Sequence, residues 1–445
     1  MNIILFDDNS RSDLLPLSYT RPCAELRLGI LTITEKWKHH LAGDFSFLTQ
    51  DYLSTKYGAT FGSDNLYLNG RCLPNDEILD ILNNLTSDEA IFDGETLIAY
   101  RGSQHLSRFD FLEEVAKSVK KIDFQGDLIN YTFDIFLKNG QEIKADYKIL
   151  TAGRISQPIS ETNTLIGDNI FVEEGATVEA SVLNSTHGPI YISANSEIME
   201  GSLIRGPFAL CEHSTIKMGA KIYGDTTVGP HSKVGGEVSN TVFYGFSNKG
   251  HDGFLGNSVI GEWCNLGADT NSSNLKNNYA PVKLWNYTKN RFVNTGLQFC
   301  GLIMGDHSKC GINTMFNTGT VVGVSANIFG AGFPRTGTTT LKQALQILGY
   351  NDTYHFKDLI ADSKKLRHWQ ELEDHGKTDF NRLFEGFKAT VDFPGYPYYK
   401  ILMAQYPEAK VILTTRDVDK WYESTSKTIR KSGPQTLIAK ITLLS

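Results

Sequence analysis

Several features that would assign the chain to common functional classes are missing from its 445 residues. The six cysteines include no CxxC pair, which indicates neither a zinc site nor a disulfide framework and fits a reducing compartment. No apolar run approaches the length of a membrane span, and the short apolar start lacks the basic flank of a secretory signal. The net charge of -7 gives no electrostatic bias toward nucleic acid. We therefore expect a cytoplasmic protein that binds neither nucleic acid nor membranes.

Length and charge distribution both indicate more than one domain. A chain of 445 residues is too long for one ordinary core. Residues 331–445 carry 17 Lys and Arg against 13 Asp and Glu, whereas residues 1–330 carry 26 against 37. This difference in the sign of the net charge is typical of two pieces of different origin.

A period of six residues runs through the middle of the chain. The pattern opens with Ile166, Val172 and Val178, continues after a turn-like segment, and returns after two interruptions up to Ile328. Its longest unbroken run consists of eight aliphatic residues: Ile192, Ile198, Ile204, Leu210, Ile216, Ile222, Val228 and Val234.

Small residues occupy two other positions of the hexad. Serine, threonine or alanine stands two positions before most of the aliphatic residues, where we expect corners. Glycine directly follows several of them, where a tight turn would need a residue without Cβ strain: Gly167, Gly229, Gly235, Gly261, Gly267, Gly305, Gly311 and Gly323. Three hexads make one triangular coil of a parallel β-helix, in which every sixth side chain points into a shared core. The alternative, a β-sandwich with regular turns, would give spacings of roughly 8 to 12 residues.

The segments on either side of the repeat have a different character. The apolar residues 3–6 predict a buried first strand, and residues 77–85 have the apolar spacing of a helix. Beyond the repeat, residues 341–348 predict an amphipathic helix and residues 410–414 a buried parallel strand. The sequence therefore predicts a mixed fold of three domains, with an α/β domain over 1–155, a parallel β-helix over 160–330 and a partial α/β segment over 331–445.

The hexads resemble those of the left-handed β-helix acyltransferases, and residues 247–279 narrow the resemblance. A Lys-x-Gly-His-like stretch there precedes a Gly-Asn hexad and an Asn-Tyr pair, as in the acetyltransferase half of bifunctional UDP-N-acetylglucosamine pyrophosphorylase/glucosamine-1-phosphate acetyltransferases. The resemblance implies acetyl transfer from acetyl-CoA to an amino-sugar phosphate or sugar nucleotide, with His251 as the general base. The residues that it implies for positioning the sugar and its phosphate are Lys249, Asn277, Asn278 and Tyr279.

The chemistry of histidine agrees with this role independently of the resemblance. A neutral imidazole titrates near working pH, so it can take a proton from an amine and return one to a thiolate. His251 lies where the hexad breaks, in the Gly-rich segment 245–256, although a surface histidine without a catalytic role would fit the same position. The family further implies coenzyme A along residues 310–330 and a homotrimer. We expect four other histidines to be surface side chains: His187, His213, His231 and His307.

Residues 1–155 resemble a diverged sugar nucleotidyltransferase. The run from Arg11 through Arg21 to Pro22 matches that family's Arg-x-x-Leu-x-Pro-Leu-x-x-Thr-Arg-Pro pattern, and Arg11 and Arg21 are candidate phosphate ligands. Two departures argue against nucleotidyl transfer. Residues 6–10 lack the glycines of the phosphate turn, and Arg71 replaces the aspartate that would bind Mg²⁺, which a cationic side chain cannot do. We expect a structural or regulatory remnant here.

Residues 331–445 resemble sulfotransferases that use 3'-phosphoadenosine 5'-phosphosulfate. A Gly-containing loop between a strand and a helix N-terminus presents free amides to an anion, and this loop has Walker spacing with Thr338 in the place of the lysine. The resemblance implies a 3'-phosphate site of Arg416 and Ser424, and His355 is a candidate base for an acceptor hydroxyl. The residues implied for the 5'-phosphosulfate loop are Arg335, Thr336, Gly337, Thr338 and Thr339.

The start and length of this last segment raise a question about its activity. Residues 328–335 must serve both as the last hexad and as the first strand and loop of a new domain, and the segment is shorter than the domains it resembles. We expect a truncated segment with little stability of its own. Two hypotheses compete with acetyl transfer, namely sulfate transfer through this segment and a non-catalytic trimeric scaffold.

Overall fold

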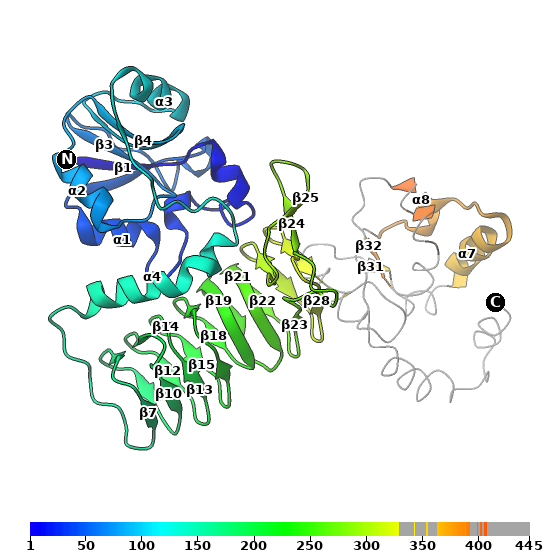
Figure 1. The fold of residues 1–445 in the computed structure, drawn as a ribbon. Helices are drawn as coiled ribbons and strands as arrows, with labels where there is room; N and C mark the ends of the chain where they lie inside the picture. The colour runs from blue at the N-terminus through cyan, green and yellow to red at the C-terminus, as the bar shows by residue number, and fades with distance from the viewer. Residues whose placement is uncertain are drawn as a thin grey trace. The chain divides into compact units, whose positions relative to one another are not determined.

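The computed structural model describes residues 1–328, 342, 353–354, 363–387, 389–391, 398, 401–402 and 405–406. The chain divides into two compact units, Met1–Asn327 and Ile328–Ser445 (Figure 1). Within the described part of the chain, no helix has the length and apolar character needed to cross a membrane.

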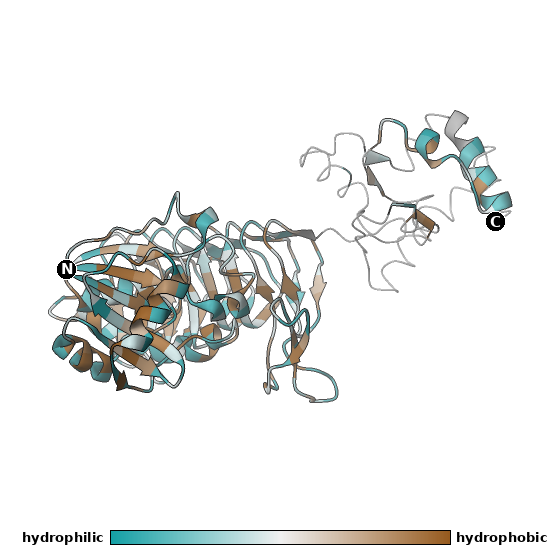
Figure 2. Ribbon diagram, turned by 90° about the horizontal axis from the view of Figure 1, so that it is seen from above, coloured by the Kyte–Doolittle hydropathy of each residue, from teal (hydrophilic) through white to brown (hydrophobic). Residues whose placement is uncertain are grey.

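A six-stranded mixed sheet forms the core of the N-terminal region. The apolar residues of its first strand are buried, as the sequence predicts, and Figure 2 shows several of its strands as predominantly apolar. The first strand pairs in parallel with the second and the third. The strands lie in the order β2-β1-β3-β5-β4-β6, and their bounds are β1 Asn2–Phe6, β2 Asp44–Leu48, β3 Asn65–Asn69, β4 Glu89–Asp93, β5 Thr96–Gly102 and β6 Lys120–Asp123.

Four α-helices and three short 3-10 helices accompany this sheet. Their bounds are η1 Asn9–Leu14, η2 Cys23–Glu25, α1 Ile33–His40, η3 Asp51–Leu53, α2 Asp76–Asn84, α3 Phe109–Ser118 and α4 Asp134–Thr151. The position of α2 confirms the helix predicted over residues 77–85. A capping box starts α1, because Thr32 and Glu35 each accept a hydrogen bond from the other's backbone amide.

Residues 164–328 form short strands, nearly all parallel, which stack in two main sheets (Figure 1). The first sheet contains β7 Thr164–Ile166, β8 Ile170–Val172, β10 Val182–Asn184, β11 Ile190–Ile192, β13 Leu203–Arg205, β14 Phe208–Leu210, β16 Lys221–Ile222, β17 Thr226–Val228, β19 Glu237–Gly245, β21 Phe254–Glu262, β26 Ile303–Met304 and β29 Val321–Val322. The second contains β9 Thr177–Val178, β12 Glu197–Ile198, β15 Thr215–Ile216, β18 Lys233–Val234, β20 Asn248–Lys249, β22 Asn265–Leu266, β27 Lys309–Cys310 and β30 Asn327–Ile328. A third parallel pair joins β23 Asn271–Ser272 to β28 Met315–Phe316.

The strand register explains the six-residue period. Ile198 pairs with Ile216, and Ile216 pairs with Val234, so one turn of chain here has three hexads. All eight aliphatic residues of the unbroken run are buried, as predicted. Ile166 differs, because it is 40% exposed. It lies in β7, an edge strand of the sheet, which has no preceding turn to cover it. The long strand β19 pairs with β16 near its start and β17 near its end, so the sheet curls.

Most of the glycines that follow the aliphatic residues do not adopt the tight-turn conformation that the sequence predicts for them. Of the eight, only Gly167 has a positive φ. At Gly229 an added Cβ would overlap the carbonyl oxygen of Tyr244 in the next turn, so the missing side chain permits close approach of two backbones. Left-handed backbone occurs instead at non-glycine residues of the turns: Asn195, His213, His231, Phe246, Trp263, His307, Asn313 and Ser325.

The N-terminal region and the stacked strands share one hydrophobic core. Leu5 and Trp37 belong to the same buried cluster as Val242 and Val259. The amide of Asn139 on α4 donates to the Asp225 carbonyl at 2.8 Å, and its oxygen accepts from the Gly29 amide at 2.7 Å. Helix α4 therefore joins the two architectures, and residue 155 marks a change of architecture within one packed unit.

An antiparallel hairpin interrupts the stack after β23. Its strands are β24 Lys283–Asn286 and β25 Arg291–Asn294. Asn286 donates to Asp13 of η1 at 2.8 Å, and the ring of Tyr287 meets that of Tyr19 edge-on. The hairpin therefore contacts the N-terminal region as well as the stack.

The described part of the C-terminal unit has an aromatic core. Its elements are β31 Thr353–Tyr354, α7 Ser363–His375, α8 Phe380–Leu383 and β32 Ala389–Thr390, and the two strands pair in parallel. Trp369 donates to the Tyr354 hydroxyl at 3.2 Å, and both side chains are buried. Most of the helix predicted at 341–348, and all of the strand predicted at 410–414, lie outside the described residues.

Candidate active site

Lys249 occupies an inward position of the stack. It pairs with Val234 of the preceding turn and is 1% exposed, so a lysine stands where the other turns place an apolar residue. Its Nζ donates to the carbonyl oxygens of Gly235 (3.0 Å), His251 (3.1 Å) and Gly253 (2.8 Å). Burial lowers the pKa of Lys249 to about 8, since nearby carboxylates only partly offset the desolvation of the ammonium. These three bonds use all the hydrogens that the ammonium has.

His251 lies in the short connection from β20 to β21, and its side chain is exposed. The next turn of the stack holds this connection by a backbone hydrogen bond, in which the amide of Asp269 donates to the Asp252 carbonyl at 3.1 Å. Gly253 has a φ of +121°, and an added Cβ would overlap the Thr270 carbonyl oxygen. The backbone on both sides of the imidazole is therefore held in place, while the ring itself remains accessible.

Asn277, Asn278 and Tyr279 lie together on the loop between β23 and β24, and all three are exposed. Tyr279 adopts a positive φ of 57°, and its amide donates to the Lys276 carbonyl at 2.9 Å. In the described part of the chain, no hydrogen bond links these three residues to His251. The structure thus places them on a separate, exposed loop.

A column of stacked rings runs along one edge of the stack. The ring centroids of Phe246 and Trp263 lie 4.5 Å apart, with an interplanar angle of 4°. His213, His231 and His307 continue the column. All three of these histidines and His187 are exposed, which confirms that they are surface side chains.

The two arginines predicted to bind phosphate are buried and have protein partners. Arg11 lies 3.1 Å from Asp7 and donates to the Tyr52 hydroxyl at 2.9 Å. Arg21 donates to Glu262 at 2.9 Å and also to Asp306, which lies in a neighbouring turn of the stack. Both guanidinium groups thus bind carboxylates within the fold.

The residues around Arg71 do not fit a magnesium ion. The guanidinium of Arg71 binds both carboxylate oxygens of Asp8, with Nε 2.9 Å from Oδ1. Asp7 accepts from the Thr49 hydroxyl at 2.5 Å and from the Cys23 amide at 2.8 Å. Among the described residues, no cluster of three His, Cys, Asp or Glu side chains could hold a metal. The carboxylates that Mg²⁺ would need are already paired with cations or bound by donors.

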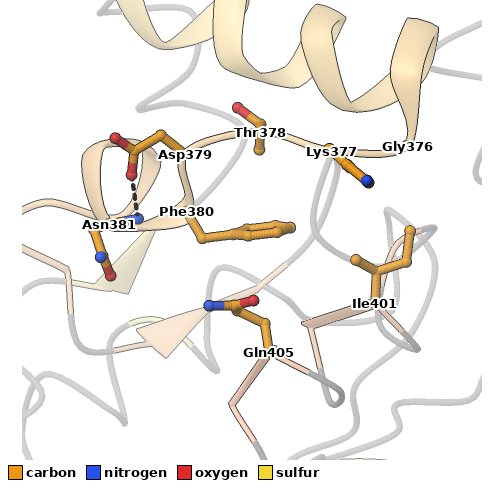
Figure 3. Close-up of a pocket in the computed structure, with 8 residues that line it drawn as sticks. All are labelled: Gly376, Lys377, Thr378, Asp379, Phe380, Asn381, Ile401 and Gln405. Carbon is orange, nitrogen blue, oxygen red and sulfur yellow. Dashed lines mark hydrogen bonds between the residues drawn. The ribbon is translucent and has the colours of Figure 1, made fainter.

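The predicted sulfotransferase residues cannot be placed. Arg335, Thr336, Gly337, Thr338, Thr339, His355, Arg416 and Ser424 all lie outside the described residues. The described part of this unit has a cleft of about 510 Å³, in which Phe380 lies near Gln405 (Figure 3). Asp379 beside it accepts from the backbone amides of Asn381 (3.1 Å) and Arg382 (3.2 Å), which caps α8.

Comparisons with known proteins agree with the resemblances at both ends of the chain. Residues 3–155 match the sugar nucleotidyl transferase family, and residues 327–445 match the sulfotransferase domain. These matches place the chain among transferases. Both resemblances drawn from the sequence motifs are thereby confirmed.

Three curated relatives extend the comparison. The bifunctional protein GlmU of Methanocaldococcus jannaschii is 29% identical over 53% of this chain and 52% of its own length. A bifunctional sugar-1-phosphate nucleotidylyltransferase/acetyltransferase of Sulfurisphaera tokodaii is 28% identical over 38% of this chain and 42% of its own length. The putative acetyltransferase YaiX of Escherichia coli is 26% identical over 42% of this chain and 78% of its own length. The chain thus spans about half the length of the two bifunctional relatives.

The structure reveals two features that the sequence motifs do not indicate. Lys249 is a buried anchor of the His251 connection, and the hexad count does not indicate this, because Lys249 lies fifteen residues after its partner Val234. Glu262 and Asp306 bind Arg21 across the core, and no short-range sequence signal indicates that contact.

Proposed function

We propose that the chain is an acetyl-CoA-dependent acetyltransferase that acts on an amino-sugar phosphate or sugar nucleotide, in a synthesis of the UDP-N-acetylglucosamine type. The observation that carries the proposal is the exposed imidazole of His251 on a connection that the buried Lys249 anchors at two carbonyl oxygens. The similarity to acetyltransferases and bifunctional nucleotidylyltransferase/acetyltransferases supports it.

In the proposed reaction, His251 accepts a proton from the sugar amine as the nitrogen attacks the thioester carbonyl carbon. The new C–N bond forms and the C–S bond breaks, so the acetyl group passes to nitrogen. His251 then returns a proton to the thiolate, which leaves the base neutral for the next turnover. The resemblance implies Lys249 as a ligand of the sugar or its phosphate, but its ammonium is buried on three backbone carbonyls, so we propose that it positions the connection instead. Asn277, Asn278 and Tyr279 are proposed to bind the sugar and its phosphate.

The described turns near residue 310 offer a surface suited to coenzyme A. Ile312 and Met315 are 71% and 78% exposed, so two apolar side chains stand in water on one turn of the stack. Apolar surface of this kind suits the pantetheine arm or a second copy of the chain. Coenzyme A would supply the activated acetyl thioester.

We further propose that the stack is a left-handed parallel β-helix of the hexapeptide kind and that the protein is a homotrimer. Three hexads per turn and the buried aliphatic column support the β-helix. Six buried free cysteines suit a reducing, cytoplasmic setting.

The N-terminal region is proposed to be structural instead of a working nucleotidyltransferase. The Asp8–Arg71 pair occupies carboxylate oxygens that a metal would need, and Arg21 joins this region to the stack. Release of pyrophosphate from UTP and a sugar 1-phosphate in the presence of Mg²⁺, lost on chelation, would contradict this part of the proposal.

Thiol release from acetyl-CoA tests the main proposal. We expect release to require both the purified chain and glucosamine 1-phosphate, with the N-acetylated sugar phosphate as product. Hydrolysis at the same rate without the amino sugar, or no release with any amino-sugar phosphate, would contradict it.

Sulfate transfer is the second candidate function, and the match of residues 327–445 to the sulfotransferase domain favours it. The donor would be 3'-phosphoadenosine 5'-phosphosulfate, bound at the loop of Arg335 to Thr339 and at Arg416 and Ser424. Stoichiometric binding of adenosine 3',5'-bisphosphate, lost in Arg335→Ala, would support this candidate.

A further inference from the structure

A cleft of about 370 Å³ lies where α4 meets the stacked strands. Three side chains on its wall, His187, Arg205 and Tyr223, recur at the eighteen-residue spacing of one turn. Each immediately precedes a glycine, and these glycines stand at 188, 206 and 224. A Cβ at position 206 would overlap the Gly188 carbonyl oxygen, so close backbone packing keeps the floor of the cleft free of side chains.

The charges that line the cleft favour an anion. Arg205 and Lys144 are exposed, and within the described part of the chain neither side chain has a hydrogen bond or an ion pair. Asp225 is the carboxylate of the lining; burial raises its pKa, and the charge of Lys144 acts in the opposite direction. Lys144 is therefore partly compensated by Asp225, whereas the charge of Arg205 is not. An anion between the two cations would relieve this imbalance.

The remaining walls suit a ring-bearing ligand. The side chain of Tyr223 is 44% exposed, so much of the aromatic ring is available to pack against the apolar face of a second ring. The imidazole of His187 can donate a hydrogen bond to a hydroxyl or a phosphate oxygen. The volume falls within the range of small-molecule sites.

We propose that this cleft binds a phosphorylated sugar, with Arg205 and Lys144 on the phosphate and Tyr223 against the sugar ring. A guanidinium can hold two phosphate oxygens at once, which a single ammonium cannot do. The inference goes beyond acetyl transfer, because no residue of the cleft belongs to the loops of His251 or Tyr279. It assigns a second small-molecule site to the junction of the two architectures.

Calorimetric titration of the full chain with inorganic phosphate and with glucose 6-phosphate, at constant ionic strength, tests the proposal. We expect Arg205→Gln to weaken binding of both probes by at least about tenfold, as the loss of a charge-assisted contact predicts. Arg205→Lys should bind both probes with an affinity between those of the original chain and Arg205→Gln, because lysine keeps the positive charge but cannot hold two phosphate oxygens at once. Tyr223→Ala should weaken glucose 6-phosphate binding about fivefold and leave inorganic phosphate unchanged.

Two matched controls remove exposed cations outside the cleft. Lys148→Gln alters the same helix one turn after Lys144, and Lys221→Gln alters the turn that carries Tyr223, so both should bind the probes as the original chain does. His251→Ala should also bind them normally, which separates this site from the acetyltransferase site. Equal affinity in Arg205→Gln, or no saturation by either probe at about 10 mM, would overturn the proposal. An unchanged glucose 6-phosphate affinity in Tyr223→Ala would overturn its assignment to a sugar.

Discussion

Arg71 and Asp8 face each other in the N-terminal region with two contacts between guanidinium and carboxylate, one of them 2.9 Å from Nε to Oδ1. Arg71 is 1% exposed and also donates to the Asn130 side chain at 2.7 Å. A buried arginine with its partners in place is a structural group, because its charge is satisfied inside the fold. Arg71, which stands where the resembling family has a metal-binding aspartate, thus stabilises the packing of this region.

Arg71→Leu should destabilise the chain by about 3 to 5 kcal/mol, because Asp8 would remain buried without its cation. Urea unfolding at neutral pH measures this change. Arg101→Leu is the control: its partner Asp64 and the arginine itself are partly exposed, and the loss should stay within about 1 kcal/mol. Equal losses in the two variants would show that the Asp8 pair is no more important than a surface ion pair.

His251→Ala should slow acetyl transfer by roughly 10² to 10⁴, since the general base is lost. The side chain is exposed and lies outside the stacked core, so the unfolding midpoint should not change. His213→Ala, an exposed histidine on another turn, should keep full turnover. Normal turnover in His251→Ala would contradict the proposed role of His251 as the general base.

Lys249 should make stability depend on pH above neutrality. Its folded pKa, about 8, lies below the ordinary lysine pKa of 10.5, so the unfolded chain binds more protons between these pH values. Stability should therefore rise with pH across this window, as the cost of burying the charge is relieved, and the full change is about 3 kcal/mol. Lys249→Met lacks this titration. The difference in unfolding free energy between the original chain and Lys249→Met should thus shift by that amount between pH 7.5 and 10.5, and a constant difference would contradict the assignment.

Gly229→Ala tests whether a glycine of the stack is needed for the close approach of two backbones or for its backbone conformation. The added Cβ would overlap the Tyr244 carbonyl oxygen, so the two turns would have to move apart, and we expect a loss of about 3 kcal/mol or more. Gly219→Ala is the matched control. Its Cβ would meet open space, while its φ of +70° adds only local strain of about 1 kcal/mol. Thermal unfolding compares the two, and a larger loss at Gly219 would show that conformation matters more than approach.

The sequence predicts periodic features well and long-range pairs poorly. The hexads locate the buried aliphatic residues because each turn of the stack repeats one local geometry. The spacing between paired residues then becomes shorter. Lys249 pairs with Val234 only fifteen residues earlier, so counting in sixes misses the inward position of Lys249. The contact between Arg71 and Asp8 depends on the sheet that brings two strand ends together. The position of Lys144 depends on how α4 packs, which no pattern within the helix specifies.

Removal of residues 336–445 should leave acetyl transfer unchanged within about twofold. The proposed acetyltransferase residues lie between Lys249 and Tyr279, inside the compact unit Met1–Asn327, and the last strand of the stack ends at Ile328. Truncation after Arg335 therefore keeps every strand of both main sheets. We also propose that residues 336–445 have little stability of their own, in which case the truncated protein should be more soluble than the full chain. Loss of activity on truncation would contradict this view of the tail. A protease-resistant tail in the full chain that binds adenosine 3',5'-bisphosphate at micromolar affinity would also contradict it, and a working bifunctional fusion would then explain the sequence better.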